Sequence, residues 1–459
     1  MKVQSYSAQW IIVAASAAVL AAALPATVQA QYQSPPPAPV AQPDFGKDTA
    51  KEARKKKKKG EEAAPVPGAD FSPEFRKQAP PVQKAVNEKK WADVIAALPA
   101  LDALPGLTPD DLKALATWRL QATQATGDTD GFMAAIEHFL EKGYAEPAQI
   151  GPMHQQLAAH YNGKKDREKT VLHYRQFIDA TPDADPDEFQ TLGRLYLQNS
   201  NYSESALWLG KAIDVAKSRG AVPGEAWFQL RDRCYVELKD QTGRLDNLEA
   251  LVGYYPNKEY YSRIVAVYQT ETRDDRTVML NAYRVAVADP KGGLETVGGY
   301  LGYADTALAA GSPGEAARGL QRGMDEKIVP SVGSNQETLK EANAAVVMDR
   351  KSLPGESTAA AKNPKGEVAV KVGLGYYSTG DYEKAVEMIR LGISKGGVAR
   401  LDDANLLLGA ALMELGRRDE AKAAFEAGKT AAGANVHMAR IAGLWLSRLG
   451  RQESAPPGG

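Results

Sequence analysis

The sequence has a single cysteine, Cys234, among its 459 residues. One thiol cannot form an internal disulfide, so the stability of the fold has to come from packing. Cys234 falls at an apolar position of a predicted helix. We therefore expect a buried, small hydrophobic side chain there, with a reactive thiol as the alternative.

The sequence also lacks the residue sets that carry catalysis or bind metals. His154 and His160 are six residues apart, which places them on different faces of a helix. There is no H-E-x-x-H motif, no cysteine pair and no G-x-x-x-x-G-K phosphate loop. The one G-x-S-x-G string, at residues 392–396, falls at the end of a predicted helix, where no strand precedes it. We expect no catalytic, cofactor-binding or metal-binding residue, no cofactor and no enzymatic activity. The histidines are His138, His154, His160, His173 and His437.

An excess of either charge is missing as well. Lysine and arginine number 56 and the acidic residues 57, which gives a formal net charge of −1. No whole-protein field would therefore attract nucleic acid, and we expect no nucleic-acid partner.

Long apolar runs are confined to the first residues. Lys2 precedes an apolar run from Trp10 to Leu24, which is shorter than the roughly 20 residues that a membrane span requires. Val28 and Ala30 fit a cleavage site before Gln31. The pattern predicts a signal peptide at 1–30, no transmembrane span after its cleavage, and export to a bacterial periplasm. A retained anchor is the alternative.

Residues 31–74 have the composition of a disordered tail. Prolines are frequent, and such a segment cannot bury enough apolar area to fold. The basic run from Arg54 to Lys59 indicates either contact with an anionic surface or a solvated linker.

Residues 368–428 contain one helical pattern written twice. Each copy has a small residue in a first helix, then a glycine turn, then a small residue and a large apolar residue in a second helix. Equivalent positions lie 36 residues apart, since 409−373 and 416−380 both give 36. A fixed period in this range predicts an all-α solenoid of antiparallel helix pairs. The matched positions are Gly373 and Gly409, Gly380 and Gly416, Ala385 and Ala421, and Ile389 and Phe425.

Weaker copies extend this pattern toward the N-terminus. Turns are expected near residues 89, 127, 165, 200, 238, 272, 311, 346, 380 and 416. The predicted organisation is an N-terminal array at 75–330, a degenerate repeat or loop at 331–367, a C-terminal repeat pair at 368–450 and a frayed tail at 451–459. The C-terminal pair includes a capping helix over 434–449, and the loop reading rests on the turn residues at 352–357 and 363–366.

The repeated pattern resembles the tetratricopeptide repeat family. Ala369 and Asn405 depart from the family, because they stand where its first-helix tryptophan is expected. The resemblance implies a right-handed superhelix whose concave, first-helix face binds peptides or proteins. The residues that carry it are Leu408, Gly409, Leu412, Ala421 and Phe425 in one copy, and Val372, Gly373, Tyr376, Tyr382, Ala385 and Ile389 in its neighbour.

Together these expectations predict that the protein is a non-enzymatic scaffold of the cell envelope that binds a protein or peptide partner. A helper that associates with glycans, in polysaccharide export or wall remodelling, is the alternative. First-helix positions that point away from the second helix are the candidate partner contacts. They are Gln190, Arg194, Phe228, Asp232, Tyr235, Ser262 and Gln269.

Overall fold

The computed structural model describes residues 70–272 and 274–454, and every regular element among them is a helix. The predicted signal peptide, nearly all of the 31–74 tail and the basic run from Arg54 to Lys59 lie outside these residues. The chain divides into two compact units, Met1–Ala184 and Asp185–Gly459. No described helix is both long enough and apolar enough to cross a membrane.

The first unit is a stack of helices in chain order. Pro109 and Pro147 each occupy the first position of a helix, where the missing N–H is no loss. The helices are α3 (Pro73–Gln78), α4 (Pro80–Asn87), α5 (Trp91–Asp102), α6 (Pro109–Thr126), α7 (Thr129–Glu141), α8 (Pro147–Gly163) and α9 (Arg167–Asp179).

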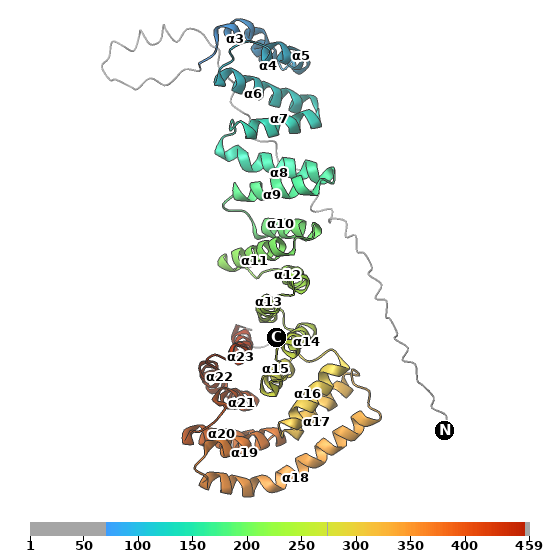
Figure 1. Cartoon of the computed structure of the whole chain (residues 1–459), viewed down its shortest axis with the longest axis vertical. Coiled ribbons are helices and arrows are strands. Elements are labelled where there is room, and N and C mark those ends of the chain that lie inside the picture. The colour runs from blue at the N-terminus through green and yellow to red at the C-terminus, as the bar shows by residue number, and fades with distance from the viewer. Residues whose placement is uncertain (1–69, 273, 455–459) are drawn as a thin grey trace, which may run out of the picture. The chain divides into compact units, whose positions relative to one another are not determined.

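The second unit continues with antiparallel pairs, so the predicted all-α solenoid of helix pairs is confirmed (Figure 1). Its first helices are α10 (Pro186–Gln198), α12 (Glu225–Leu238), α14 (Lys258–Glu271), α16 (Val297–Ala309), α19 (Gly366–Thr379) and α21 (Leu401–Glu414). Their second helices are α11 (Tyr202–Ser218), α13 (Gln241–Tyr254), α15 (Arg276–Ala288), α17 (Pro313–Asp325), α20 (Tyr382–Lys395) and α22 (Arg418–Ala431). Two helices are unpaired, α18 (Ser334–Lys362) and α23 (Val436–Ser454).

Nine of the ten expected turns fall between helices of a pair. Left-handed backbone marks most of them, for example Gly127 with φ +76° and Gly380 with φ +83°. Glycine adopts this conformation without steric cost, which is why glycines at these turns were readable in the sequence. The tenth expected turn, at 346, is wrong because it lies inside α18.

The small residues of the repeat pattern sit where paired helices touch. A Cβ on Gly373 would lie 2.5 Å from Cγ1 of Ile389, and a Cβ on Gly409 would overlap the ring of Phe425. Ala385 and Ala421 are fully buried. The period of 36 residues therefore repeats a close approach between helix backbones, as expected.

The segment 331–367 is mostly one helix, so its interpretation as a loop is wrong. α18 runs for 29 residues through Pro354 and Gly355. Both residues are exposed, so the carbonyl that proline leaves without an N–H donor can bond to water. Leu353 is buried beside them, and its Cδ2 lies 2.7 Å from where a Cβ on Gly375 of α19 would be. Packing on the neighbouring helix thus overrides the local turn residues.

Cys234 is fully buried in α12, as expected for a small hydrophobic residue. Its Sγ lies 3.2 Å from Oγ of Ser205, and burial raises the pKa of the thiol. A raised pKa leaves little of the reactive thiolate at neutral pH.

Candidate partner-binding surface

The first helix α10 contacts the next first helix, α12, and side chains of α14 reach α12 in turn. Side chains fix α12 to α14: the hydroxyl of Tyr260 donates to Oε1 of Glu225 at 2.6 Å and accepts from Nε2 of Gln229 at 2.6 Å. Tyr260 is itself buried. This part of the first-helix face is therefore held in place before any partner arrives.

Asp232 was expected to be free to contact a partner, and this expectation is wrong. Only 3% of the residue is exposed. Its two carboxylate oxygens accept from Nε of Arg244 at 2.9 Å and from Nη1 of Arg263 at 3.0 Å. Asp232 therefore ties α12 to α13 and α14, and its removal would leave two arginines without their acceptor.

Phe228 was also expected to face outward and is instead fully buried. Its ring lies 6.0 Å from the ring of Tyr254, and its carbonyl accepts from Nδ2 of Asn247 at 2.8 Å. Both contacts lie on α13. Phe228 turns toward the second helix of its own pair, because the helix is apolar on that side.

Gln190 and Arg194 of α10 are partly exposed, and neither makes a hydrogen bond or an ion pair with a described residue. They are four residues apart, so they share one face of the helix. A guanidinium with no partner within the fold is available for a carboxylate or a backbone carbonyl of another molecule.

The remaining three predicted contacts have local partners. Tyr235 is half-buried with the guanidinium of Arg231 5.2 Å from its ring. Oγ of Ser262 accepts from the backbone N–H of Glu295 at 2.8 Å. Gln269 is exposed and donates from Nε2 to the hydroxyl of Tyr283 at 2.8 Å. These contacts orient the side chains, and partner binding through them stays a prediction.

The first unit holds a polar cluster that the sequence did not reveal. Nδ1 of His154, on α8, lies 3.2 Å from Nδ1 of His173, on α9. Tyr161 stacks on His173 with ring centroids 5.5 Å apart, donates to Oε1 of Glu137 at 2.6 Å, and accepts from Nζ of Lys169 at 2.8 Å. Three helices meet at this cluster.

Burial sets the protonation of the two imidazoles. Desolvation, with the nearby His173, lowers the pKa of His154 to about 4, and desolvation also lowers the pKa of His173. Both rings are neutral at pH 7, so one Nδ1–H donates to the other ring's lone pair. Two imidazoles are also fewer ligands than a structural zinc site uses, and no three metal-ligating side chains converge anywhere in the described residues.

The histidine pair escaped sequence reasoning because its members lie on different helices, nineteen residues apart. The spacing of His154 and His160 shows only that these two side chains lie on different faces of one helix. A period that aligns α8 with α9 locates the turn at residue 165, but it does not say which side chains face each other across the pair.

Comparisons with known proteins match the C-terminal part of the chain to a repeat family. The sequence profile of the tetratricopeptide repeat matches residues 402–435, which hold α21 and α22. No curated protein matches the sequence.

Solved structures similar to this chain include other helical-repeat proteins. A tetratricopeptide repeat protein from Parabacteroides merdae is 11% identical, over 64% of this chain and 98% of that chain, with a TM-score of 0.25. The C-terminal part of a repeat-containing protein from Cytophaga hutchinsonii is 11% identical, over 70% of this chain and 97% of that chain, with a TM-score of 0.23. Such low values carry no argument about a partner.

Proposed function

We propose that this all-helical chain, whose residues 402–435 match the tetratricopeptide repeat, is a non-enzymatic scaffold for a protein or peptide partner. The repeat fold suggests protein–protein interaction. We place the contact on the first-helix face of α10, α12 and α14. The observation that carries this choice is the pair Gln190 and Arg194, which is partly exposed and has no partner within the described residues.

The neighbouring helices support this choice. Asp232, Arg244 and Arg263 form a fixed network beside the surface, so binding would not have to order these side chains. The charges along α12 and α14 are of both signs, and Asp232, Glu259 and Arg263 form ion pairs. A partner with its own mixed polar surface and an acidic group for Arg194 fits this arrangement better than a strongly charged polymer.

A pull-down with paired variants tests the site. The chain without residues 1–30 is immobilised and exposed to envelope extract, and captured proteins are identified. R194E should lower the capture of a specific protein at least about tenfold, the equivalent of 1.4 kcal/mol. K217E makes a similar charge change on the exposed side of the second helix α11 and should leave capture unchanged.

Other outcomes of this experiment would count against the proposal. Equal capture by R194E and the parent would remove α10 from the site. Retention on purified envelope glycan with no protein enriched would favour a glycan-associated helper instead.

Export to the periplasm is part of the same proposal and has its own test. Alkaline phosphatase fused after residue 74 should be active, because the enzyme needs an oxidising compartment to form its disulfides. Deletion of residues 2–30 should abolish this activity, and an active deletion variant would contradict export through the predicted signal peptide.

We also propose that the basic run from Arg54 to Lys59 contacts an anionic surface. Each basic residue near such a surface contributes about 1 kcal/mol. Replacing the six residues with glutamine should therefore reduce co-sedimentation with vesicles containing anionic lipid, and should leave sedimentation with neutral vesicles unchanged. Equal co-sedimentation by both proteins would identify the run as a solvated linker.

A further inference from the structure

The second helix α15 is buried on all sides. Every residue from Val278 to Ala286 is buried, including Asn281 and Arg284. The second helix of an ordinary pair exposes one face to solvent, and its sequence is polar there. Some other part of the chain must therefore cover the outer face of α15.

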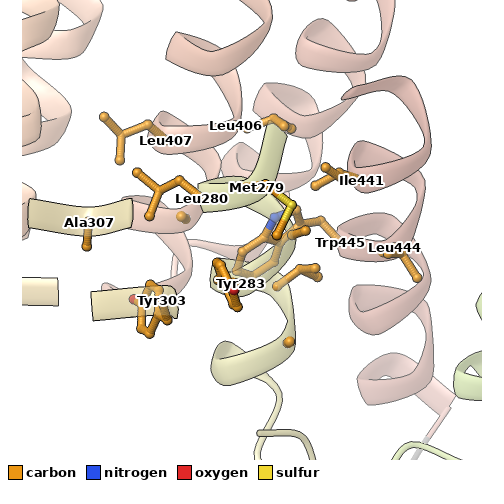
Figure 2. Close-up of a cluster of buried hydrophobic side chains, with 14 of the residues drawn as sticks. Met279, Leu280, Tyr283, Tyr303, Ala307, Leu406, Leu407, Ile441, Leu444 and Trp445 are labelled. Carbon is orange, nitrogen blue, oxygen red and sulfur yellow. The ribbon is translucent and has the colours of Figure 1, made fainter. Parts of the chain in front are cut away.

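The cover comes from the first helix α21 and from the unpaired helix α23. α21 and α23 both contact α15, although more than a hundred residues separate them in sequence (Figure 1). Figure 2 shows the apolar part of this contact, which belongs to one continuous core. It gathers Met279, Leu280 and Tyr283 of α15 with Leu406, Leu407, Ile441, Leu444 and Trp445 of α21 and α23.

Polar contacts fix the position of α15 along this face. Nδ2 of Asn281 donates to Oδ1 of Asp403 at 2.7 Å, and Nη1 of Arg284 lies 3.7 Å from the same oxygen. The guanidinium of Arg284 also lies 5.7 Å from the ring centroid of Tyr377, on α19. The first helices α19 and α21 and the unpaired helix α23 thus all contact one helix, α15.

Ion pairs at the edge of the contact join α23 to α13. Arg440 pairs with Asp246 and with Glu249, the latter at 3.0 Å. Arg451 donates to the carbonyl of Val252 at 2.7 Å. Arg451 also pairs with Asp289, the residue that follows α15, so only the pairs of Arg440 can be changed without removing a contact to the end of α15.

Four buried polar atoms of α15 and α23 have no hydrogen-bond partner among the described residues. They are Asn281 Oδ1, His437 Nδ1, Trp445 Nε1 and Arg448 Nε. A cavity of about 430 Å³ remains where α23 meets α13.

The link to the C-terminal repeats is also weakly packed. α18 has only three buried residues, Ala342, Leu353 and Ala360. Cavities of about 500 and 520 Å³ lie along it, and Arg350 lines both. Movement of the C-terminal repeats away from α15 would also have to break the contact of α17 with α19, where the N–H of Gly314 donates to Oγ of Ser378 at 2.8 Å.

We infer that α19, α21 and α23 together form a groove for an amphipathic helix, which α15 occupies in cis. The competing partner is a helix that presents an apolar stripe and an arginine to Asp403 and Tyr377, as α15 does. The groove is separate from the α10–α14 surface, so neither proposal depends on the other.

Peptide binding to the full chain tests the groove. The probe is a labelled peptide of residues 274–290, and the control peptide carries R284E. The variant D246K/E249K removes the ion pairs of α13 with Arg440 and leaves the groove residues intact. We expect it to bind the probe at least about tenfold more tightly than the wild type does. D214K, a change on the exposed side of α11, should bind like the wild type.

Hydrogen exchange in α15 reports whether the groove has opened. If α15 remains as protected in D246K/E249K as in the wild type, R451E is added to remove the contacts with Val252 and Asp289, and the probe is shortened to residues 274–288 so that it lacks Asp289. Faster exchange of α15 in a helical protein that still fails to bind the probe overturns the proposal. Equal binding of the two peptides also overturns the proposal. Protection of α15 that persists in both variants overturns it as well, because a groove that never empties cannot receive a partner.

Discussion

Gly409 and Gly355 show how differently one residue type acts in this fold. Gly409 lies against the ring of Phe425, and its hydrogen is what allows α21 and α22 to pack closely. Gly355 lies inside α18, and a Cβ added to it would have no atom within 4 Å. Sequence reasoning identified the first through its period and misread the second as a turn residue.

Alanine at these two positions should have opposite effects. G409A should destabilise the protein by about 1–3 kcal/mol, because the added methyl group forces Phe425 to move. G355A should stabilise it slightly, by up to about 1 kcal/mol, because alanine is the better helix former. Urea denaturation followed by circular dichroism measures both, and equal effects would contradict the packing role of Gly409.

Acid should destabilise the histidine pair of the first unit. The pKa of His154 falls from its usual 6.5 to about 4 on folding. Between these two pH values the unfolded chain therefore binds more protons than the folded chain. The contribution of neutral His154 to the free energy of unfolding is full above pH 6.5 and is lost as the pH falls toward 4. We expect a loss of about 1–2 kcal/mol, seen as faster hydrogen exchange in α8 and α9.

One variant in the histidine pair and one at an exposed histidine separate this effect from general acid denaturation. H154Q should flatten the pH dependence of exchange in α8 and α9. His138 is exposed on α7, so H138Q should keep the parent profile. An unchanged profile in H154Q would show that the pair does not govern the acid response.

At the scale of elements, the turns could be predicted from the sequence, but the helices that each helix packs against could not. A left-handed residue stands at nearly every expected turn because the chain must reverse there within a few residues. α18 was missed because Pro354 and Gly355 are typical turn residues, while the evidence against a turn lies on α19, which α18 packs against. Local sequence could not report that contact.

The anchoring of α18 rests on Leu353. L353A should destabilise the protein by about 2–4 kcal/mol, since the residue is 3% exposed and fills the hollow at Gly375. V347A on the same helix should change stability by less than about 0.5 kcal/mol, because Val347 is 53% exposed. Thermal unfolding compares them, and similar losses would mean that α18 is held elsewhere.

At the scale of the second unit, the chain joins regions that are far apart in sequence. Periodicity predicts stacking between neighbours, so the fold class, the turns and the small-residue contacts followed from it. It cannot predict that α21 and α23 return to α15, because that contact joins helices far apart in sequence. It also did not show that Phe228 and Asp232 are buried, because the period does not say which side chains of α12 face α13 and α14.

The buried pair of Arg284 and Glu315 is the most sensitive point of this arrangement. Nε and Nη2 of Arg284 donate to the two oxygens of Glu315 at 2.9 and 2.7 Å. E315Q should cost about 3–5 kcal/mol, because it leaves the arginine buried without its full counter-charge. E387Q, in an exposed pair with Lys384, should have little effect. Chemical denaturation of both variants checks this difference.

The enclosure of α15 also constrains the order in which the protein can mature. Synthesis runs from the N-terminus, so α15 is complete long before α21 and α23 exist to cover Met279 and Leu280. During that interval the nascent chain carries an apolar face with no cover, which makes it prone to association. A chain that ends before residue 401 should keep this face permanently and aggregate, whereas loss of residues 452–459 should be tolerated.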